Sequence, residues 1–170
     1  MENKREIKIK PPNQCSAKEI ESFYQILLKG EAVEKRGLKN RINRAILLAF
    51  HYENQILVGI AAIKLPSEGY RSNIFRKAET KEPLEKYPLE FGYAVTLEGY
   101  EGRHICSGLT QKLIENFQDQ NMYATTSRPA MQTILEHNGF KKTGKPYKGE
   151  RTSEGGHLLQ LFVRTAHKAI

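Results

Sequence analysis

The alternation of apolar and polar residues predicts a strand followed by helices in the first part of the chain. Residues 6–10 alternate with the period of a strand. Ser16 and Glu19 have the spacing of a capping box, and the apolar side chains after them recur at helical spacing as far as Gly30. A second helix is predicted over 31–41.

A long apolar region in the middle of the chain predicts a β-hairpin. Residues 45–52 and 56–65 form two apolar runs, and the polar residues 53–55 between them suit a tight turn. The mixed segment 66–88 follows, and within it we expect a helix over 72–81. Because segments of this length in compact domains often carry function, 66–88 is a candidate for substrate contacts.

The second half alternates strands and helices and closes with two strands. The expected elements are a strand over 89–95, a helix from Ile105, a strand over 122–126, a helix from Pro129 to Asn138, and strands over 140–143 and 158–164. No internal repeat or low-complexity linker interrupts this order. We therefore expect one α+β domain over 1–170.

Composition narrows the class of protein. With 170 residues, 39% of them apolar, the chain is long enough to bury one sizeable core. Cys15 and Cys106 lie far apart and form no CxxC pair, which argues against a zinc site or a disulfide framework. No apolar run reaches the length of a membrane span, and the first ten residues are charged, so we expect a cytoplasmic protein with no membrane partner.

The net charge of +8 bears on possible partners. Excess lysine keeps a small protein soluble, and it also attracts polyanions or phosphorylated ligands. No run of basic residues interleaved with aromatics marks a nucleic-acid surface. A nucleic-acid partner is therefore permitted by the charge but not indicated by a motif.

The stretch Gly99–Leu109, GYEGRHICSGL, joins the strand over 89–95 to the helix from Ile105. Backbone N–H groups and the positive end of the dipole make a helix N-terminus a natural site for pyrophosphate. Close approach of the phosphates needs small residues, which Gly99, Gly102 and Gly108 supply, and Arg103 adds a cation.

This stretch resembles the acetyl-CoA loop of the GNAT superfamily of acyl-CoA N-acyltransferases. Five residues match the family string, Arg103 is a like-charged replacement and three residues depart from it. The matches are Tyr100, Gly102, Ile105, Ser107 and Leu109, and the departures are Glu101, His104 and Cys106. A second register, beginning at Arg103, places Gly108 at the last glycine but gives up two of the matches.

A second stretch, 124–140, resembles the family's other hallmark, a strand followed by a helix that closes on Gly-Phe. Gly139 and Phe140 match, whereas Arg128 and Met131 stand where the family has asparagine and alanine. The resemblance covers nearly the whole chain. It implies a mixed, mostly antiparallel central sheet flanked by about four helices, with a splayed strand pair that holds the cofactor.

The resemblance further implies an N-acetyltransferase that moves an acetyl group from acetyl-CoA to a primary amine, by direct attack through a tetrahedral intermediate. Main-chain amides bind the pyrophosphate, so His104 and Cys106 are tolerated if neither position needs a positive φ. The residues implied in acetyl-CoA binding are Tyr93, Ala94, Val95, Gly102, Arg103, His104, Ile105, Cys106, Ser107, Gly108 and Arg128.

The amine must lose a proton before it attacks, and Glu90 is the first candidate for the base, with Glu98 second. Leu135 occupies the slot where many members have a tyrosine that protonates the thiolate. Cys106 has no recognisable base beside it, which argues against a covalent mechanism. Other candidates for the acid are Tyr123, Tyr147, Ser127 and His137, and the sequence does not rank them.

Two other functions remain open at this point. A CoA-binding module without turnover fits the altered loop and the missing tyrosine. An acetyltransferase acting on aminoacyl-tRNA fits the positive charge. The acceptor, whether a small amine or a protein amino group, is not specified by any motif, and a homodimer is compatible with the sequence.

Overall fold

The computed structural model describes residues 2–30, 33–149 and 158–167. Contacts divide the chain into two compact units, Met1–Lys64 with Gly92–Leu113 (unit 1) and Leu65–Phe91 with Ile114–Ile170 (unit 2). The strand β4 (Leu89–Thr96) and the helix α4 (Ile105–Glu115) contribute to both units. The strand order is β1-β2-β3-β4-β5-β7-β6.

Unit 1 is built on three antiparallel strands. Register pairs β1 with β2 and β2 with β3, and the β2–β3 turn passes through Asn54 and Gln55, both with positive φ (48° and 68°). The predicted hairpin is therefore confirmed. The elements are β1 (Arg5–Lys10), the 3-10 turn η1 (Pro12–Gln14), α1 (Ala17–Gly30), α2 (Leu38–Asn43), β2 (Leu47–Glu53) and β3 (Ile56–Lys64).

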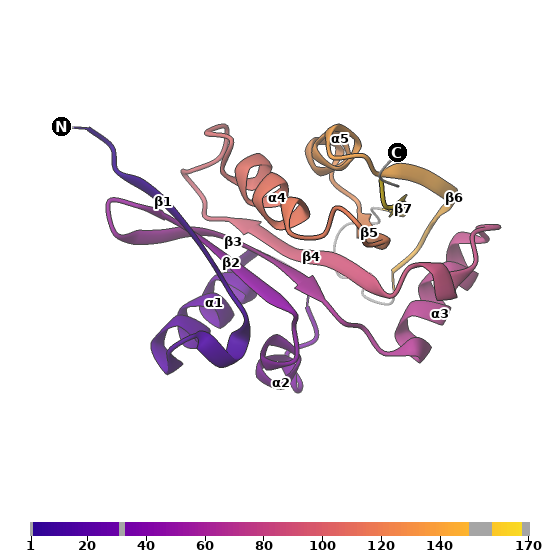
Figure 1. Cartoon of the computed structure of the whole chain (residues 1–170), viewed down its shortest axis with the longest axis horizontal. Coiled ribbons are helices and arrows are strands. Elements are labelled where there is room, and N and C mark those ends of the chain that lie inside the picture. Colours follow the sequence, from indigo (N-terminus) through magenta and orange to yellow (C-terminus); the bar gives the residue numbers. More distant parts are fainter. Residues whose placement is uncertain (1, 31–32, 150–157, 168–170) are drawn as a thin grey trace. The chain divides into compact units, whose positions relative to one another are not determined.

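The helices α1 and α2 cover one face of these strands (Figure 1). The predicted capping box starts α1, since the Glu19 N–H donates to Ser16 Oγ (3.1 Å) and the Ser16 N–H donates to Glu19 Oε1 (2.9 Å). From α1, the Phe23 ring meets the edges of Phe50 and Tyr93, with centroids 5.6 and 6.3 Å away. This aromatic contact joins α1 to β2 and β4 in one core.

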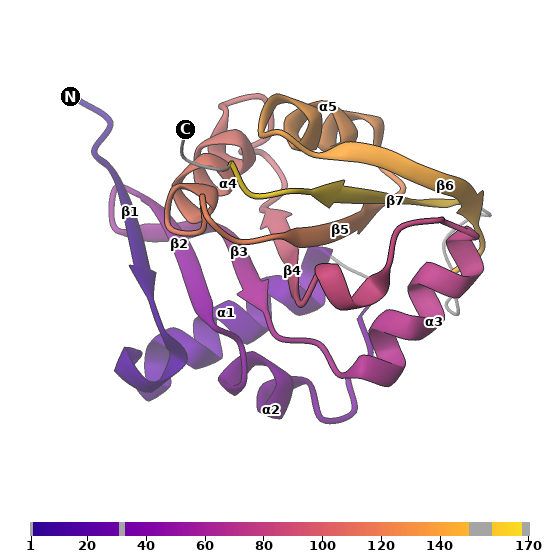
Figure 2. The same ribbon diagram turned by 45° about the vertical axis from the view of Figure 1, so that its right-hand side comes forward.

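Unit 2 continues the sheet from the first residues of β4. Leu89 and Glu90 pair in parallel with Met122 and Tyr123, while β7 is antiparallel to both β5 and β6. The helix α3 lies against β6 and β7 (Figure 2). The elements are α3 (Glu68–Ala78), the 3-10 turn η2 (Leu84–Lys86), β5 (Met122–Thr126), α5 (Pro129–His137), β6 (Lys141–Tyr147) and β7 (Leu159–Arg164).

Two helix predictions were wrong in their bounds. The helix predicted over 31–41 is α2, which begins at Leu38 because Gly37 adopts a left-handed conformation (φ 69°) that a continuous helix excludes; residues 31 and 32 lie outside the described residues. The helix predicted over 72–81 is α3, which begins four residues earlier. Its N-cap is Ser67, and Glu79, with φ 51°, ends it.

The strand predicted over 140–143 is longer than expected. β6 runs to Tyr147 across a register shift after Thr143, and Gly144 there has φ 70°. The pattern of apolar residues missed this extension because most of β6 is exposed. Within the described residues, none of the helices combines the length and the apolar character needed to cross a membrane.

Replacing Gly144 with alanine tests the packing of β6 on α3. The new Cβ would lie 2.2 Å from the Ala78 carbonyl oxygen, at a φ that disfavours side chains. We expect Gly144→Ala to lower the free energy of unfolding by at least about 2 kcal/mol in urea titrations. Gly69→Ala is the control, since a Cβ there meets nothing within 4 Å. Equal stability of the two variants would contradict this packing.

Candidate functional site

The strand β4 bends at Tyr93, which has a positive φ (55°) inside a strand. Such a conformation costs about 1–3 kcal/mol for a residue other than glycine. The Tyr93 ring is buried in the core of unit 1, where the Lys64 ammonium lies 4.2 Å from its centroid. The Val95 side chain is in the same core, so Tyr93 and Val95 offer a ligand only their backbone groups.

The loop after β4 leaves free space at its two glycines, Gly99 and Gly102. The Leu97 N–H donates to the Val58 carbonyl (2.8 Å) and closes β4 against β3. Gly99 and Gly102 then have φ values of 90° and 76°, and a Cβ built on either meets no atom within 4 Å. The glycines therefore supply both the turn and the free space that the sequence predicted.

The sequence analysis accepted His104 in the loop on the condition that position 104 needs no positive φ, and this condition is not met. His104 has a φ of 61°, directly before the first residue of α4. The chain reaches the helix through a left-handed residue there, and histidine adopts this region more readily than most residues without glycine's freedom. Cys106 lies inside α4, so at that position no glycine is required by the backbone.

Packing fixes the N-terminus of α4 on β3. Gly59 has no side chain, and a Cβ there would lie 2.5 Å from Ile105 Cγ2 and 3.3 Å from Leu109 Cδ1. Ile105 is buried and holds the helix, whereas Ser107 and Gly108 are half-buried. The Gly108 N–H donates to the His104 carbonyl (3.0 Å), which closes the first turn of the helix.

Arg103, predicted as a cation for the cofactor, is tied to a buried carboxylate. Its Nη1 lies 3.0 Å from Glu53 Oε2, and its guanidinium stacks 4.9 Å from the Tyr100 ring centroid. Arg5 forms a second link, with Nε 3.2 Å from Glu53 Oε1 and Nη1 donating to the Arg103 carbonyl (3.2 Å). Glu53 thereby fastens the loop to β1 and β2.

Sequence reasoning missed this role of Glu53, which was assigned to a polar turn. Its side chain is 3% exposed. Burial raises the pKa of the Glu53 carboxyl, but the Asn3 amide and the Arg5 and Arg103 guanidiniums outweigh burial and hold this pKa below its ordinary value. His51 Nε2 lies 3.8 Å from Glu53 Oε1, and burial lowers the pKa of that imidazole.

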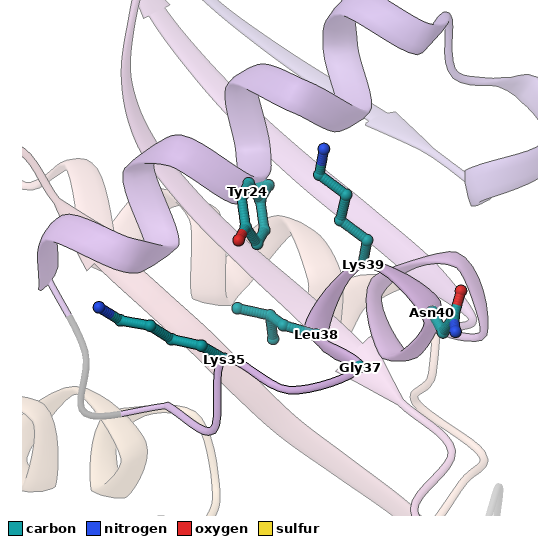
Figure 3. A pocket seen from close by; sticks show the side chains of 6 residues that line it. All are labelled: Tyr24, Lys35, Gly37, Leu38, Lys39 and Asn40. Carbon is teal, nitrogen blue, oxygen red and sulfur yellow. The ribbon is translucent and has the colours of Figure 1, made fainter.

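A pocket in unit 1 lies between α1 and α2 (Figure 3). The Lys39 ammonium pairs with Glu21 Oε2 (2.5 Å) and lies 4.8 Å from the Tyr24 ring centroid. None of the residues that the sequence predicts for the site lines this pocket. The lining residues are Tyr24, Lys35, Gly37, Leu38, Lys39 and Asn40.

The predicted base, Glu90, is buried in unit 2 and paired with a tyrosine. It is 4% exposed, and its Oε2 accepts a hydrogen bond of 2.6 Å from the Tyr123 hydroxyl. The parallel register of β4 and β5 sets these two residues opposite each other. Burial, and then Glu90, raises the pKa of Tyr123, so its hydroxyl remains protonated and acts as a donor.

Tyr147 belongs to the same cluster. Its side chain is buried, and its pKa is raised by burial first and then by Tyr70 and Glu90. Of the four residues proposed from the sequence as acids, Tyr123 and Tyr147 are therefore close enough to interact with Glu90. The arrangement is a buried carboxylate that accepts a hydrogen bond from one phenol, Tyr123, while Tyr147 bonds Thr125. Such a carboxylate can accept a proton.

The remaining sequence candidates are spread over unit 2 and the loop. Arg128 is exposed as the N-cap of α5, with its N–H donating to Thr126 Oγ1 (3.1 Å). Leu135 is buried in α5, as its apolar character requires. Ser127 is half-buried and His137 exposed, while Glu98 is exposed in the loop of unit 1.

A pair of substitutions at His104 tests its left-handed backbone. Alanine keeps the strain that glycine relieves, so we expect His104→Gly to be more stable than His104→Ala by about 1 kcal/mol in urea titrations. Inside α4 the order should reverse, with Cys106→Ala more stable than Cys106→Gly by about 1 kcal/mol. If alanine were more stable than glycine at position 104 as well, residue 104 would be helical, which would contradict its left-handed backbone.

A Glu53→Gln variant tests the link between the loop and β2. A carboxyl with a lowered pKa stabilises the fold above its ordinary pKa of 4.5, and this contribution is lost as the pH falls further. We therefore expect Glu53→Gln to be less stable than the native chain at pH 7 and to lose less stability between pH 5.5 and 3.5. Glu98→Gln removes an exposed carboxylate as control. Parallel losses in all three proteins would contradict the link.

No family model matches the chain, and no curated protein does. Solved structures match the chain over nearly its whole length. An acyl-CoA N-acyltransferase from Pseudomonas aeruginosa is 11% identical with a TM-score of 0.69, over 95% of this chain and 100% of its own. A GNAT family acetyltransferase from Streptococcus agalactiae is 17% identical with a TM-score of 0.65, over 95% and 96%.

A third structure was solved with a ligand. Arabidopsis thaliana Naa50, in complex with the bisubstrate analogue CoA-Ac-MVNAL, is 14% identical with a TM-score of 0.64, over 94% of this chain and 98% of its own. At these identities the likeness concerns the fold. It confirms the predicted α+β class with a mixed, mostly antiparallel sheet, and five α-helices are present among the described residues.

Proposed function

We propose that this chain, whose fold is that of the GNAT acyltransferases, is an N-acetyltransferase that moves an acetyl group from acetyl-CoA to a primary amine. The observation that carries the proposal is the open loop 97–104 leading into the fixed N-terminus of α4. The backbone N–H groups and the dipole of a helix N-terminus at such a loop suit a pyrophosphate. The strand that leads into the loop also carries a buried carboxylate, Glu90.

The loop residues present fit the proposed co-substrate. Gly99 and Gly102 leave space, and Ser107 and Gly108 are small residues in the first turn of α4. Backbone groups of Tyr93 to Val95 and the Arg128 side chain are proposed to complete the binding residues. Arg103 keeps the loop in place through Glu53, so its contribution to binding is in part indirect. Acetyl-CoA supplies the activated thioester carbonyl.

Glu90 is proposed to take the proton from the amine before the attack. Its carboxylate is held by the Tyr123 hydroxyl at 2.6 Å, which fixes its orientation. Tyr123 is a positioning residue in this scheme, because its raised pKa keeps the proton on its own oxygen. Leu135 offers no proton, so the scheme assigns no acid to that position. CoA leaves as the thiolate, and the second proton, which the nitrogen loses as the amide forms, passes to that thiolate.

Acetyl-CoA binding and turnover test the proposal separately. We expect calorimetric titration to show binding of acetyl-CoA, and an amine panel to show release of free thiol. Glu90→Gln should lower kcat by roughly 10²–10⁴-fold and leave the Kd for acetyl-CoA unchanged, because a base contributes to chemistry rather than to cofactor binding. Glu85→Gln, which removes an exposed carboxylate of unit 2, should keep full activity.

Two outcomes contradict the proposal in different ways. Binding without thiol release for any amine would identify a CoA-binding module that performs no transfer. Absence of binding would mean that the loop does not hold acetyl-CoA at all. If Glu90→Gln kept full kcat, the base would be another group, and Glu98 would be the next variant to measure.

A further inference from the structure

Arg71 lies in the first turn of α3, where hydrogen bonds to Ser67 fix the backbone. Ser67 caps the helix, accepting the Tyr70 N–H on its Oγ (3.3 Å) and the Arg71 N–H on its carbonyl (3.1 Å). The Arg71 side chain reaches the segment before β4, where Nη1 donates to the Tyr87 carbonyl (3.1 Å). Phe75, one turn further along α3, packs against the rings of Tyr87 and Tyr123.

The Arg71 guanidinium is only partly satisfied by these contacts. Among the residues that the structure describes, its Nε is buried and has no hydrogen-bond partner. A buried N–H donor without an acceptor destabilises a fold, so such groups are uncommon unless a ligand or water completes them. As the side chain stands there is no room for a ligand beside Nε, so an anion binds Nε once the half-buried Arg71 side chain turns toward solvent.

The cluster around Glu90 lies within electrostatic reach of this cation. Burial raises the pKa of the Tyr123 hydroxyl, and Arg71 acts against that rise, whereas Glu90 adds to it. Tyr70, which is 48% exposed, interacts with both Tyr123 and Tyr147. A carboxylate that accepts protons and a cation with a free donor are thus gathered about one hydroxyl, with an exposed tyrosine beside them.

We propose that the acceptor amine also carries a carboxylate, and that Arg71 binds this carboxylate through Nε–H. The inference rests on the proposed function and names its substrate class: an amino acid or a similar small molecule with both groups. A planar guanidinium matches the geometry of a carboxylate, which lysine does not. After Glu90 has taken the first proton, the amine nitrogen forms the new bond to the acetyl carbon and the C–S bond breaks. CoA leaves as the thiolate, which takes the second proton from the nitrogen, and the carboxylate of the acceptor stays unreacted.

Matched acceptors test this assignment directly. Each amino acid of a panel is compared with its primary amide, which keeps the amine and removes the negative charge. We expect kcat/KM to be at least tenfold higher for the acid in the native chain. Arg71→Gln should lower kcat/KM for the acid at least tenfold and leave the amide within twofold, and Arg71→Lys should give an intermediate ratio.

Arg76→Gln is the matched control. Arg76 lies on the same helix, is exposed and bonds Asn73 Oδ1 (2.7 Å), so its replacement removes the same charge without touching the cluster. It should keep the native preference for acids. A purely structural Arg71 would instead affect acid and amide equally, which would overturn the inference, as would a native chain that uses the amide as well as the acid.

A binding measurement separates this inference from the proposed function. If no amine causes thiol release, the function fails, but the affinity of the CoA-loaded chain for an N-acetyl amino acid and for its amide still tests Arg71. Titration followed by NMR should show at least tenfold tighter binding of the acid, lost in Arg71→Gln. Equal affinities in the native chain would overturn the inference even if Arg71→Gln failed to fold.

Discussion

The course of β4 through Tyr93 is the constraint on which the proposed site depends. A non-glycine residue with φ 55° is unfavourable in a strand, and the surrounding core has to compensate for it. The Tyr93 ring meets the edge of Phe23, and Val95 fills the space that the missing side chain of Gly30 leaves. Hydrophobic burial thus stabilises a bend whose backbone groups are proposed to face the co-substrate.

The loop after β4 is held in place by two contacts within unit 1. Gly59 allows Ile105 and Leu109 of α4 to lie against β3. The buried carboxylate of Glu53 forms a salt bridge with Arg103. His104 then carries the remaining strain of the turn. The position of the loop is therefore a property of the packing around it, and its proposed binding of an anion depends on these contacts.

Local patterns in the sequence predicted the elements that local interactions create. The Ser16–Glu19 capping box, the β2–β3 hairpin and the strand, loop and helix around Gly102 were all recognisable, because neighbouring residues determine them. The start of α2 was missed because the left-handed Gly37 interrupts a favourable helical pattern. The pairs Glu53–Arg103 and Glu90–Tyr123 could not be predicted, since each depends on strand register or on partners tens of residues away.

The helix α3 is capped at both ends, by Ser67 at its N-terminus and by the left-handed Glu79 at its C-terminus. Its inner face contributes Ile74 and Phe75 to the core, while its first turn presents Tyr70 to solvent. A segment bounded in this way can change its exposed residues without disturbing the strands. If the first turn of α3 binds the acceptor as proposed, substitutions in this one helix would change the acceptor without moving Glu90.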